Sequence, residues 1–236
     1  MNLAIMQPYF FPYLGYVQLM QLADVFVIYD DVNFIKQGWI NRNTILSAQG
    51  PQRFTVALKE ASSNKKINEI CLGSNRSKLV RTIEVNYRRA PFFQEVMPFV
   101  ELCLNSKINN LAEWLEFTLL QLSDLLGITT KFLVASRMEN SFSDLAGQNR
   151  VIAICRALGA DTYINPEGGM GLYSGRDFFN HGITLRFLKH EARGYRQFPK
   201  RDSFVPNLSV LDVLMFVGPQ GVRDRHEDFR LLRASD

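Results

Sequence analysis

Two short apolar runs near the start of the chain, at residues 3–6 and 25–29, are typical of strands buried on both faces of a sheet. Apolar residues recur at helical spacing between them, from residue 14 to residue 20. Pro8 and Pro12 keep the intervening stretch out of that helix. The pattern predicts a β-loop-α-β unit with a right-handed crossover.

A different rhythm follows this unit. Apolar and polar residues alternate from residue 53 to residue 59, and the stretch 39–46 can pair with them across Gly50 and Pro51. This pattern predicts a two-stranded antiparallel hairpin outside the main sheet. After the middle of the chain the α/β pattern returns, and we expect strands or helices at residues 132–134, 144–158, 162–164, 183–187 and 209–216.

The middle of the chain, at about residues 74–127, has a helical pattern throughout. Its clearest helix begins at the capping signal formed by Asn110 and Glu113 and stops before Gly127. We expect this stretch to be a helical insertion or subdomain within one α/β domain at residues 1–236. The fold class predicted is Rossmann-like, with a mostly parallel sheet resembling those of nucleotidyltransferases.

Composition narrows the range of partners. Hydrophobic residues make up 47% of the chain and charged residues 21%, as in ordinary globular proteins. The net charge of +4 suits an anionic small ligand at least as well as a nucleic acid, and there is no dense Lys/Arg stripe. We therefore expect a small-molecule substrate and no nucleic-acid partner.

The three cysteines lie far apart without C-x-x-C spacing, which favours free thiols over a disulfide framework or a zinc site. No apolar run is long enough to span a bilayer, and the chain begins without the pattern of a signal peptide. These features predict a cytoplasmic protein with no membrane span.

Ligands of open parallel sheets bind at the carboxyl ends of the strands, and the segment after the first expected strand lies there. This segment, residues 7–16, is unusually aromatic for a loop, and its tyrosine hydroxyls need partners if they are buried. Gly15 would let a ligand approach the backbone. The alternative is that the rings only plug the sheet end. We expect ligand binding by Gln7, Tyr9, Tyr13, Gly15 and Tyr16.

The segment after the second strand, residues 30–43, carries the most polar chemistry. Asp30 and Asp31 could hold Mg²⁺ or a hydroxylated substrate, and one of them would be the general base. Lys36 and Arg42 could neutralise phosphate or carboxylate. Alternatively, the aspartates cap a turn and residues 41–43 form a hairpin bend. The expected catalytic residues are Asp30, Asp31, Lys36 and Arg42, and the expected binding residues are Asn33, Trp39, Asn41 and Asn43.

A third candidate, residues 163–173, places glycines after a strand, as in a phosphate- or sugar-binding loop, although a plain turn explains them equally well. Its expected binding residues are Asn165, Gly168, Gly169 and Tyr173. His181, His190 and His226 lack the spacing of metal ligands, so we expect them at the surface or hydrogen-bonded, with no metal site.

Four ordered motifs resemble the signatures of the WbqC-like protein family: QPYFFPYLGY at 7–16, YDDVNFIKQGWINRN at 29–43, YINPEGGMGLY at 163–173 and LSVLDVLM at 208–215. The family is associated with bacterial O-antigen and other surface-polysaccharide gene clusters. The resemblance implies transfer of glycine or a related acyl group to an amino sugar or nucleotide sugar. A non-catalytic sugar- or nucleotide-binding protein and a scaffold of a polysaccharide-assembly complex are the alternatives.

Tyr13-Leu14-Gly15-Tyr16 also occupies the place where adenylyltransferase-like enzymes, including pantoate–β-alanine ligase, carry H-x-G-H. That similarity implies ATP with Mg²⁺ as cofactor and an adenylate as intermediate. Tyrosine, with an unperturbed pKa of about 10, carries no positive charge. Lys36 and Arg42 would therefore have to stabilise the phosphates in place of the two histidines.

Overall fold

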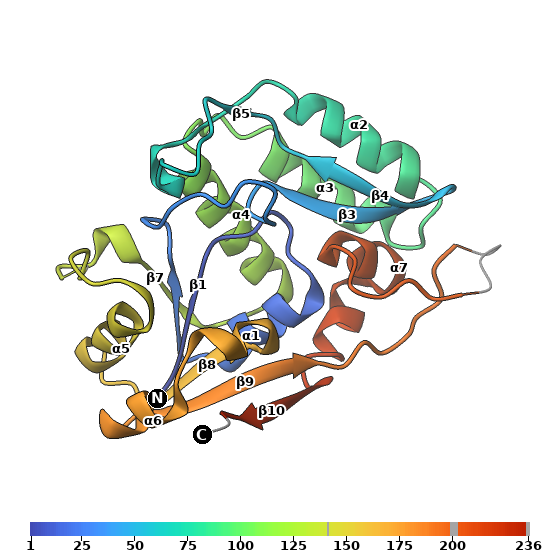
Figure 1. Cartoon of the computed structure of the whole chain (residues 1–236). Helices are drawn as coiled ribbons and strands as arrows, with labels where there is room; N and C mark the ends of the chain where they lie inside the picture. The colour runs from blue at the N-terminus through green and yellow to red at the C-terminus, as the bar shows by residue number, and fades with distance from the viewer. Residues whose placement is uncertain (141, 199–202, 235–236) are drawn as a thin grey trace.

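A six-stranded sheet forms the centre of a mixed α/β structure (Figure 1), seen in a computed structural model that describes residues 1–140, 142–198 and 203–234. The strand order is β10-β9-β8-β1-β2-β7. Neighbouring strands run parallel except β10, which is antiparallel to β9. The mostly parallel sheet is therefore confirmed. Its strands are β1 (Asn2–Met6), β2 (Val25–Ile28), β7 (Lys131–Val134), β8 (Thr162–Pro166), β9 (Thr184–His190) and β10 (Phe229–Arg233).

The order of the strands reverses at β1. The chain first adds β2 and β7 on one side of β1, and then adds β8, β9 and β10 on the other. All four residues of β2 are buried, as the uninterrupted apolar run predicts for a strand covered on both faces. The loops that leave β1 and β8 in opposite directions open a space between them at their carboxyl ends.

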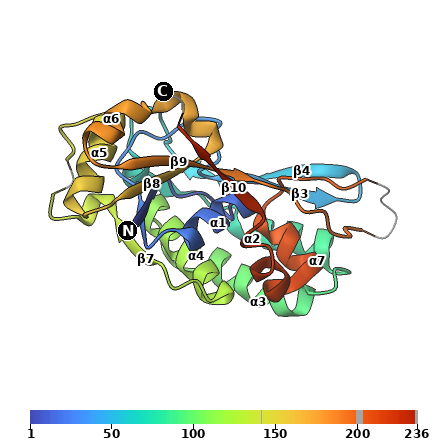
Figure 2. The same cartoon turned by 90° about the horizontal axis from the view of Figure 1, so that it is seen from below.

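Helices cover both faces of the sheet, as Figure 2 shows. On one face, α1 (Leu14–Leu22) and α4 (Leu111–Leu126) pack on an apolar cluster that includes Phe26 and Leu119. On the other face, α5 (Gly147–Ala157) and α6 (Gly175–Asn180) pack on a cluster that includes Val27 and Phe178. No helix in the described ranges has both the length and the apolar character needed to cross a bilayer.

The helical middle packs with the later helix α7 (Val210–Arg223) and with a hairpin in the largest apolar cluster. Asn110 caps α4 by accepting hydrogen bonds from the backbone N–H groups of Ala112 and Glu113, and Gly127 ends it in a left-handed conformation, as expected. That residues 74–127 form a subdomain stays a prediction. The other elements here are α2 (Arg76–Tyr87), α3 (Phe93–Leu104), β3 (Arg42–Ser47), β4 (Gly50–Thr55), β5 (Leu58–Lys59) and β6 (Cys71–Leu72).

Some expected boundaries were wrong. The alternating strand expected at 53–59 is divided: β4 ends at Thr55, and Leu58 and Lys59 pair with β6. The helix expected at 144–158 begins at Gly147. The one expected at 209–216 continues to Arg223 through a non-helical Gly218. Strand β10 was not expected.

Candidate functional site

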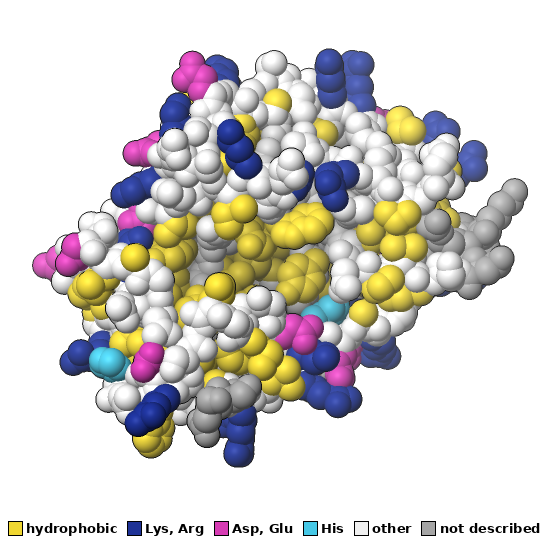
Figure 3. Space-filling model, in the orientation of Figure 1, with side chains coloured by type: hydrophobic (Ala, Val, Ile, Leu, Met, Phe, Trp, Pro, Cys, Tyr) yellow, Lys and Arg dark blue, Asp and Glu magenta, His cyan; other side chains and the backbone are white. Residues whose placement is uncertain are grey.

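A cleft of about 380 Å³ opens at the carboxyl ends of β1, β8 and β9, where the strand order reverses. Figure 3 shows this face hollowed at its centre, with hydrophobic side chains gathered in the hollow and a histidine and acidic groups at its edge. The residues that line the cleft are Tyr9, Pro12, Tyr13, Trp39, Asn43, Glu167, Gly168, Leu188, His190 and Asn207.

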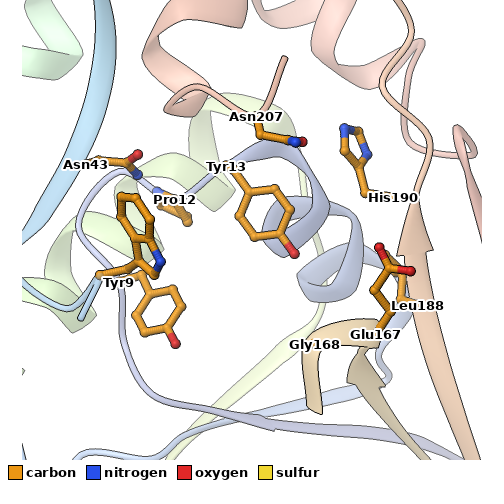
Figure 4. Close-up of a pocket in the computed structure, with 10 residues that line it drawn as sticks. Tyr9, Pro12, Tyr13, Asn43, Glu167, Gly168, Leu188, His190 and Asn207 are labelled. Carbon is orange, nitrogen blue, oxygen red and sulfur yellow. The ribbon is translucent and has the colours of Figure 1, made fainter. Parts of the chain in front are cut away.

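Three aromatic side chains supply the apolar surface of the cleft. Tyr9 packs its ring 5.4 Å from that of buried Tyr16, and Tyr13 lies between Tyr9 and the polar side of the cleft (Figure 4). Trp39 is 47% exposed, with the guanidinium of Arg53 5.8 Å from its ring. Rigid rings that remain partly open to solvent offer flat surfaces for a ligand.

The loop that carries the tyrosines is held by buried polar groups. Asn43 donates through its side-chain amide to the carbonyls of Phe10 (3.2 Å) and Phe11 (2.6 Å). Ser209, which caps α7, donates to the same carbonyl of Phe11 at 2.7 Å. Phe11 has a φ of +39°, which is rare for a residue with a side chain, and these bonds with its burial hold it there.

The opposite side of the cleft is polar. Glu167, at the end of β8, forms an ion pair with Lys189 at 3.5 Å. His190, at the end of β9, packs edge-on against Tyr13 with 6.1 Å between ring centroids. Its Nδ1 lies 2.9 Å from the side-chain oxygen of Gln18 on α1. The cleft thus combines aromatic surfaces with a carboxylate, an imidazole and two asparagine side chains.

Burial changes the protonation of these groups. It raises the pKa of Tyr13 to about 12, with smaller contributions from Tyr9 and the Glu167 carboxylate. It also raises the pKa of Tyr9. The pKa of His190 is lowered by burial, although the carboxylates of Asp228, Glu167 and Glu191 act in the opposite direction. Near neutral pH the tyrosines are therefore hydrogen-bond donors and the imidazole is neutral.

Five of the residues expected from the sequence meet in this cleft, and the two expected aspartates lie elsewhere. Asp30 accepts from the N–H and hydroxyl of Ser136, at 3.0 and 2.6 Å, and from the amide of Asn68 at 3.3 Å. It lines a separate polar hollow of about 210 Å³. The expected residues in the cleft are Tyr9, Tyr13, Trp39, Asn43 and Gly168.

Asp31 forms a buried ion pair with Arg150 of α5 at 2.5 Å. Arg150 in turn lies over the ring of Tyr29, 4.8 Å from its centroid. The other carboxylate oxygen of Asp31 is buried without a hydrogen-bond partner among the described residues. This carboxylate connects the end of β2 to α5 and does not line the cleft.

The remaining residues of the first loop are packed. The Tyr16 hydroxyl donates to the carbonyl of Gln7 at 2.9 Å, which gives the buried hydroxyl its partner. The Cα of Gly15 faces two neighbouring side chains, and the approach of a ligand to its backbone stays a prediction. A Cβ at Gly15 would lie 2.4 Å from the ring of Tyr13 and 2.9 Å from Cβ of His190, so those side chains occupy the space.

The segment after β2 places its cations outside the cleft lining. Lys36 and Asn33 are exposed. Arg42 donates through Nε to the carbonyl of Gly38 at 2.7 Å, and Asn41 donates to the carbonyl of Val56 at 2.8 Å. Asn41 and Arg42 thereby shape the turn that presents Trp39 to the cleft.

Of the expected binding residues in the third candidate segment, only Gly168 lines the cleft. Asn165 is buried and donates to the hydroxyl of Tyr163 at 2.8 Å, and that hydroxyl lies 3.3 Å from the hydroxyl of Tyr173. Gly169 lies so close to Asn165 that a Cβ there would be 2.2 Å from its side-chain oxygen. These three expected residues support the turn that carries Gly168 to the cleft.

Glu167, His190 and Asn207 line the cleft but were not among the expected binding residues, although Glu167 lies within the third candidate segment. The rule that selected the loops after the first two strands also applies to the ends of β8 and β9, and it would have found the first two. Among the described residues, no group of three or more His, Cys, Asp or Glu side chains is placed to hold a metal ion.

The model of the WbqC-like protein family matches residues 7–224 of the chain. "Uncharacterized protein Rv1507c" of Mycobacterium tuberculosis (strain ATCC 25618 / H37Rv) is 29% identical over 224 residues, which cover 93% of this chain and 95% of the relative. No solved structure matches the chain.

Proposed function

The chain belongs to the WbqC-like protein family, and from its cleft we propose that it is an acyl or aminoacyl transferase, or an ATP-dependent ligase, that acts on an amino sugar or nucleotide sugar in surface-polysaccharide biosynthesis. The observation that carries the proposal is the aromatic cleft at the reversal of strand order. Such a reversal is where doubly wound, Rossmann-like sheets bind ligands.

The lining of the cleft suits a sugar. The rings of Tyr9 and Trp39 offer flat apolar surfaces, and Asn207 supplies an amide group. The carboxylate of Glu167 offers a partner for an amino group. The ten described residues that line the cleft include no lysine or arginine, so this cleft fits the sugar better than a triphosphate.

ATP with Mg²⁺ is the proposed source of activation for the carboxyl group, with Lys36 and Arg42 as the phosphate contacts. Their test is a thermal-shift titration with ATP–Mg²⁺. A ligand at a concentration of about 100 times its dissociation constant raises the free energy of unfolding by about 2.7 kcal/mol. We expect Lys36→Ala to abolish the shift. A shift that survives both Lys36→Ala and Arg42→Ala would refute these contacts.

The two tryptophans allow a direct test of sugar binding. Trp39 lines the cleft, whereas Trp114 is fully buried in the core and donates to the carbonyl of Cys103. Glucosamine and UDP-N-acetylglucosamine that stack in the cleft should change the emission of Trp39 alone. Trp39→Phe should abolish the response. The matched control, Phe179→Ala, removes an aromatic ring that is 80% exposed and outside the cleft lining, and should keep it.

No response with either compound, in a protein that is folded, would refute sugar binding in this cleft. A response without any transfer when acyl donors are added would favour the alternative, a non-catalytic sugar- or nucleotide-binding protein, because the aromatic surfaces alone are sufficient for binding.

A further inference from the structure

We propose that His190 is the catalytic base of the cleft and that Gln18 fixes the tautomer that makes it one. This inference rests on the proposed function, because it names the group that takes the proton from the amine of the acceptor sugar. It begins from the place of His190 at the end of β9, where its side chain lines the cleft beside Tyr13 and Glu167 (Figure 4).

The side-chain amide of Gln18 has only one orientation that satisfies its neighbours. Its nitrogen lies 2.7 Å from the carbonyl oxygen of Arg225 and 3.1 Å from that of Asp228. Carbonyl oxygens only accept hydrogen bonds, so the amide nitrogen must face them. Gln18 is 1% exposed, so the alternative orientation would oppose the amide oxygen to two carbonyls without water to separate them.

The orientation of Gln18 determines the proton on His190. The amide oxygen is turned toward Nδ1 of His190 at 2.9 Å, and an amide oxygen cannot donate. Nδ1 must therefore carry the hydrogen, which leaves Nε2 of the neutral imidazole with its lone pair. The backbone carbonyl of Asp228 also accepts a hydrogen bond from the imidazole.

The surroundings keep the imidazole neutral. Burial lowers the pKa of His190 despite the carboxylates of Glu167, Glu191 and Asp228, which are the charged groups that act on it. Tyr13, which packs against the ring, stays protonated because its own pKa is raised to about 12. A neutral imidazole whose Nε2 keeps its lone pair at pH 7 is the form that a general base requires.

The neutral amine nitrogen of the acceptor forms a bond to the carboxyl carbon of an activated acyl donor, either an adenylate or a thioester. The bond from that carbon to the leaving group breaks, and the leaving group keeps the electron pair. The proton released by the amine passes to Nε2 of His190, and the imidazolium formed is stabilised by the nearby Glu167 carboxylate.

The tautomer is measured on the full chain by two-bond ¹H–¹⁵N correlation of the histidine side chains, with His190→Gln to assign the resonance. We expect the Nδ1–H tautomer for His190 in the free protein. We expect Gln18→Met, which keeps the shape but removes the acceptor, to release the Nε2–H tautomer. An Nε2–H tautomer in the unaltered protein overturns the proposal.

The same spectra recorded with glucosamine test contact with the acceptor. We expect a shift of the His190 Nε2 resonance and unchanged resonances for His181 and His226, which are exposed and outside the cleft lining. A Trp39 response to glucosamine with an unchanged His190 resonance overturns the role of His190 and keeps the proposed function. No Trp39 response overturns the proposed function and this role with it.

Discussion

The carboxylate of Asp212 anchors the segment that brings Asn207 to the cleft. Two tyrosines donate to this carboxylate, and their Tyr→Phe variants can be compared directly. Asp212 is fully buried in the first turn of α7. Its Oδ2 accepts from the hydroxyl of Tyr87 at 2.7 Å. Its Oδ1 accepts from the hydroxyl of Tyr195 at 2.6 Å and from the amide of Gln197 at 3.0 Å. A Tyr→Phe change at either position removes one oxygen and one donor.

The two changes should have different costs. Tyr195→Phe removes the hydrogen bond to the charged group, which costs about 1.5–3 kcal/mol of unfolding free energy. The Gln197 amide, 3.5 Å from the Tyr195 hydroxyl, keeps its bonds to Val205 and Asp212, so no buried donor is left unpaired. Tyr87→Phe removes the equivalent bond and also the acceptor of the Leu46 N–H, which donates to the Tyr87 hydroxyl at 2.9 Å. Leaving this buried N–H unpaired adds about 1–3 kcal/mol. Tyr87→Phe should therefore cost about 2.5–6 kcal/mol in total.

Urea unfolding followed by circular dichroism measures both free energies under identical conditions. Tyr13→Phe is the control, because no described residue forms a hydrogen bond with its hydroxyl, and it should change the unfolding free energy by less than about 0.5 kcal/mol. Equal destabilisation by Tyr195→Phe and Tyr87→Phe would show that the bond from the Leu46 N–H to Tyr87 contributes nothing to stability.

Three further outcomes follow from the contacts described above. Breaking the buried ion pair by Asp31→Leu or Arg150→Met should each cost about 3–5 kcal/mol in urea unfolding, while the double variant should recover most of the loss; equal losses in all three would contradict this. Because the pKa of Tyr13 is raised to about 12, the folded state keeps a proton that the unfolded chain loses above pH 10, so stability should fall from pH 10 to 12. The unfolding free energy of Tyr13→Phe should fall less steeply over this pH range. An unchanged pH dependence would refute the raised pKa of Tyr13. Gly15→Ala should cost about 1–3 kcal/mol and weaken sugar binding by displacing the Tyr13 ring, whereas Gly171→Ala, outside the cleft lining and with open space at its Cβ, should do neither.

The sheet was predictable because its strands carry strong local signals. The continuous apolar runs of β1 and β2 can be buried only between two layers of helix, and Asn110 and Gly127 mark the ends of α4 by local chemistry. Strand β10 lacked such a signal. It is an edge strand whose residues Arg230 and Leu231 are exposed, so neither face shows an apolar pattern.

The candidate site was partly predictable for a related reason. The strand-end rule brought Tyr9, Tyr13 and Asn43 to one place, because that rule depends only on topology. Asp31 pairs with Arg150 and Asp30 accepts from Ser136, and both of these partners lie more than 100 positions away. No local sequence pattern shows that an aspartate at a strand end will bond to such distant residues and will not face the cleft.

The central place of β1 in the sheet has a consequence for how the chain folds during synthesis. β1 pairs with β2 along one edge, but its other edge pairs with β8, which begins at Thr162. About 130 residues separate the end of β2 from that partner. At roughly 5–20 residues per second, the ribosome takes on the order of ten seconds to supply it. During that interval an apolar strand in the middle of the future sheet presents unpaired backbone groups, so this molecule should depend on chaperones more than its size alone suggests.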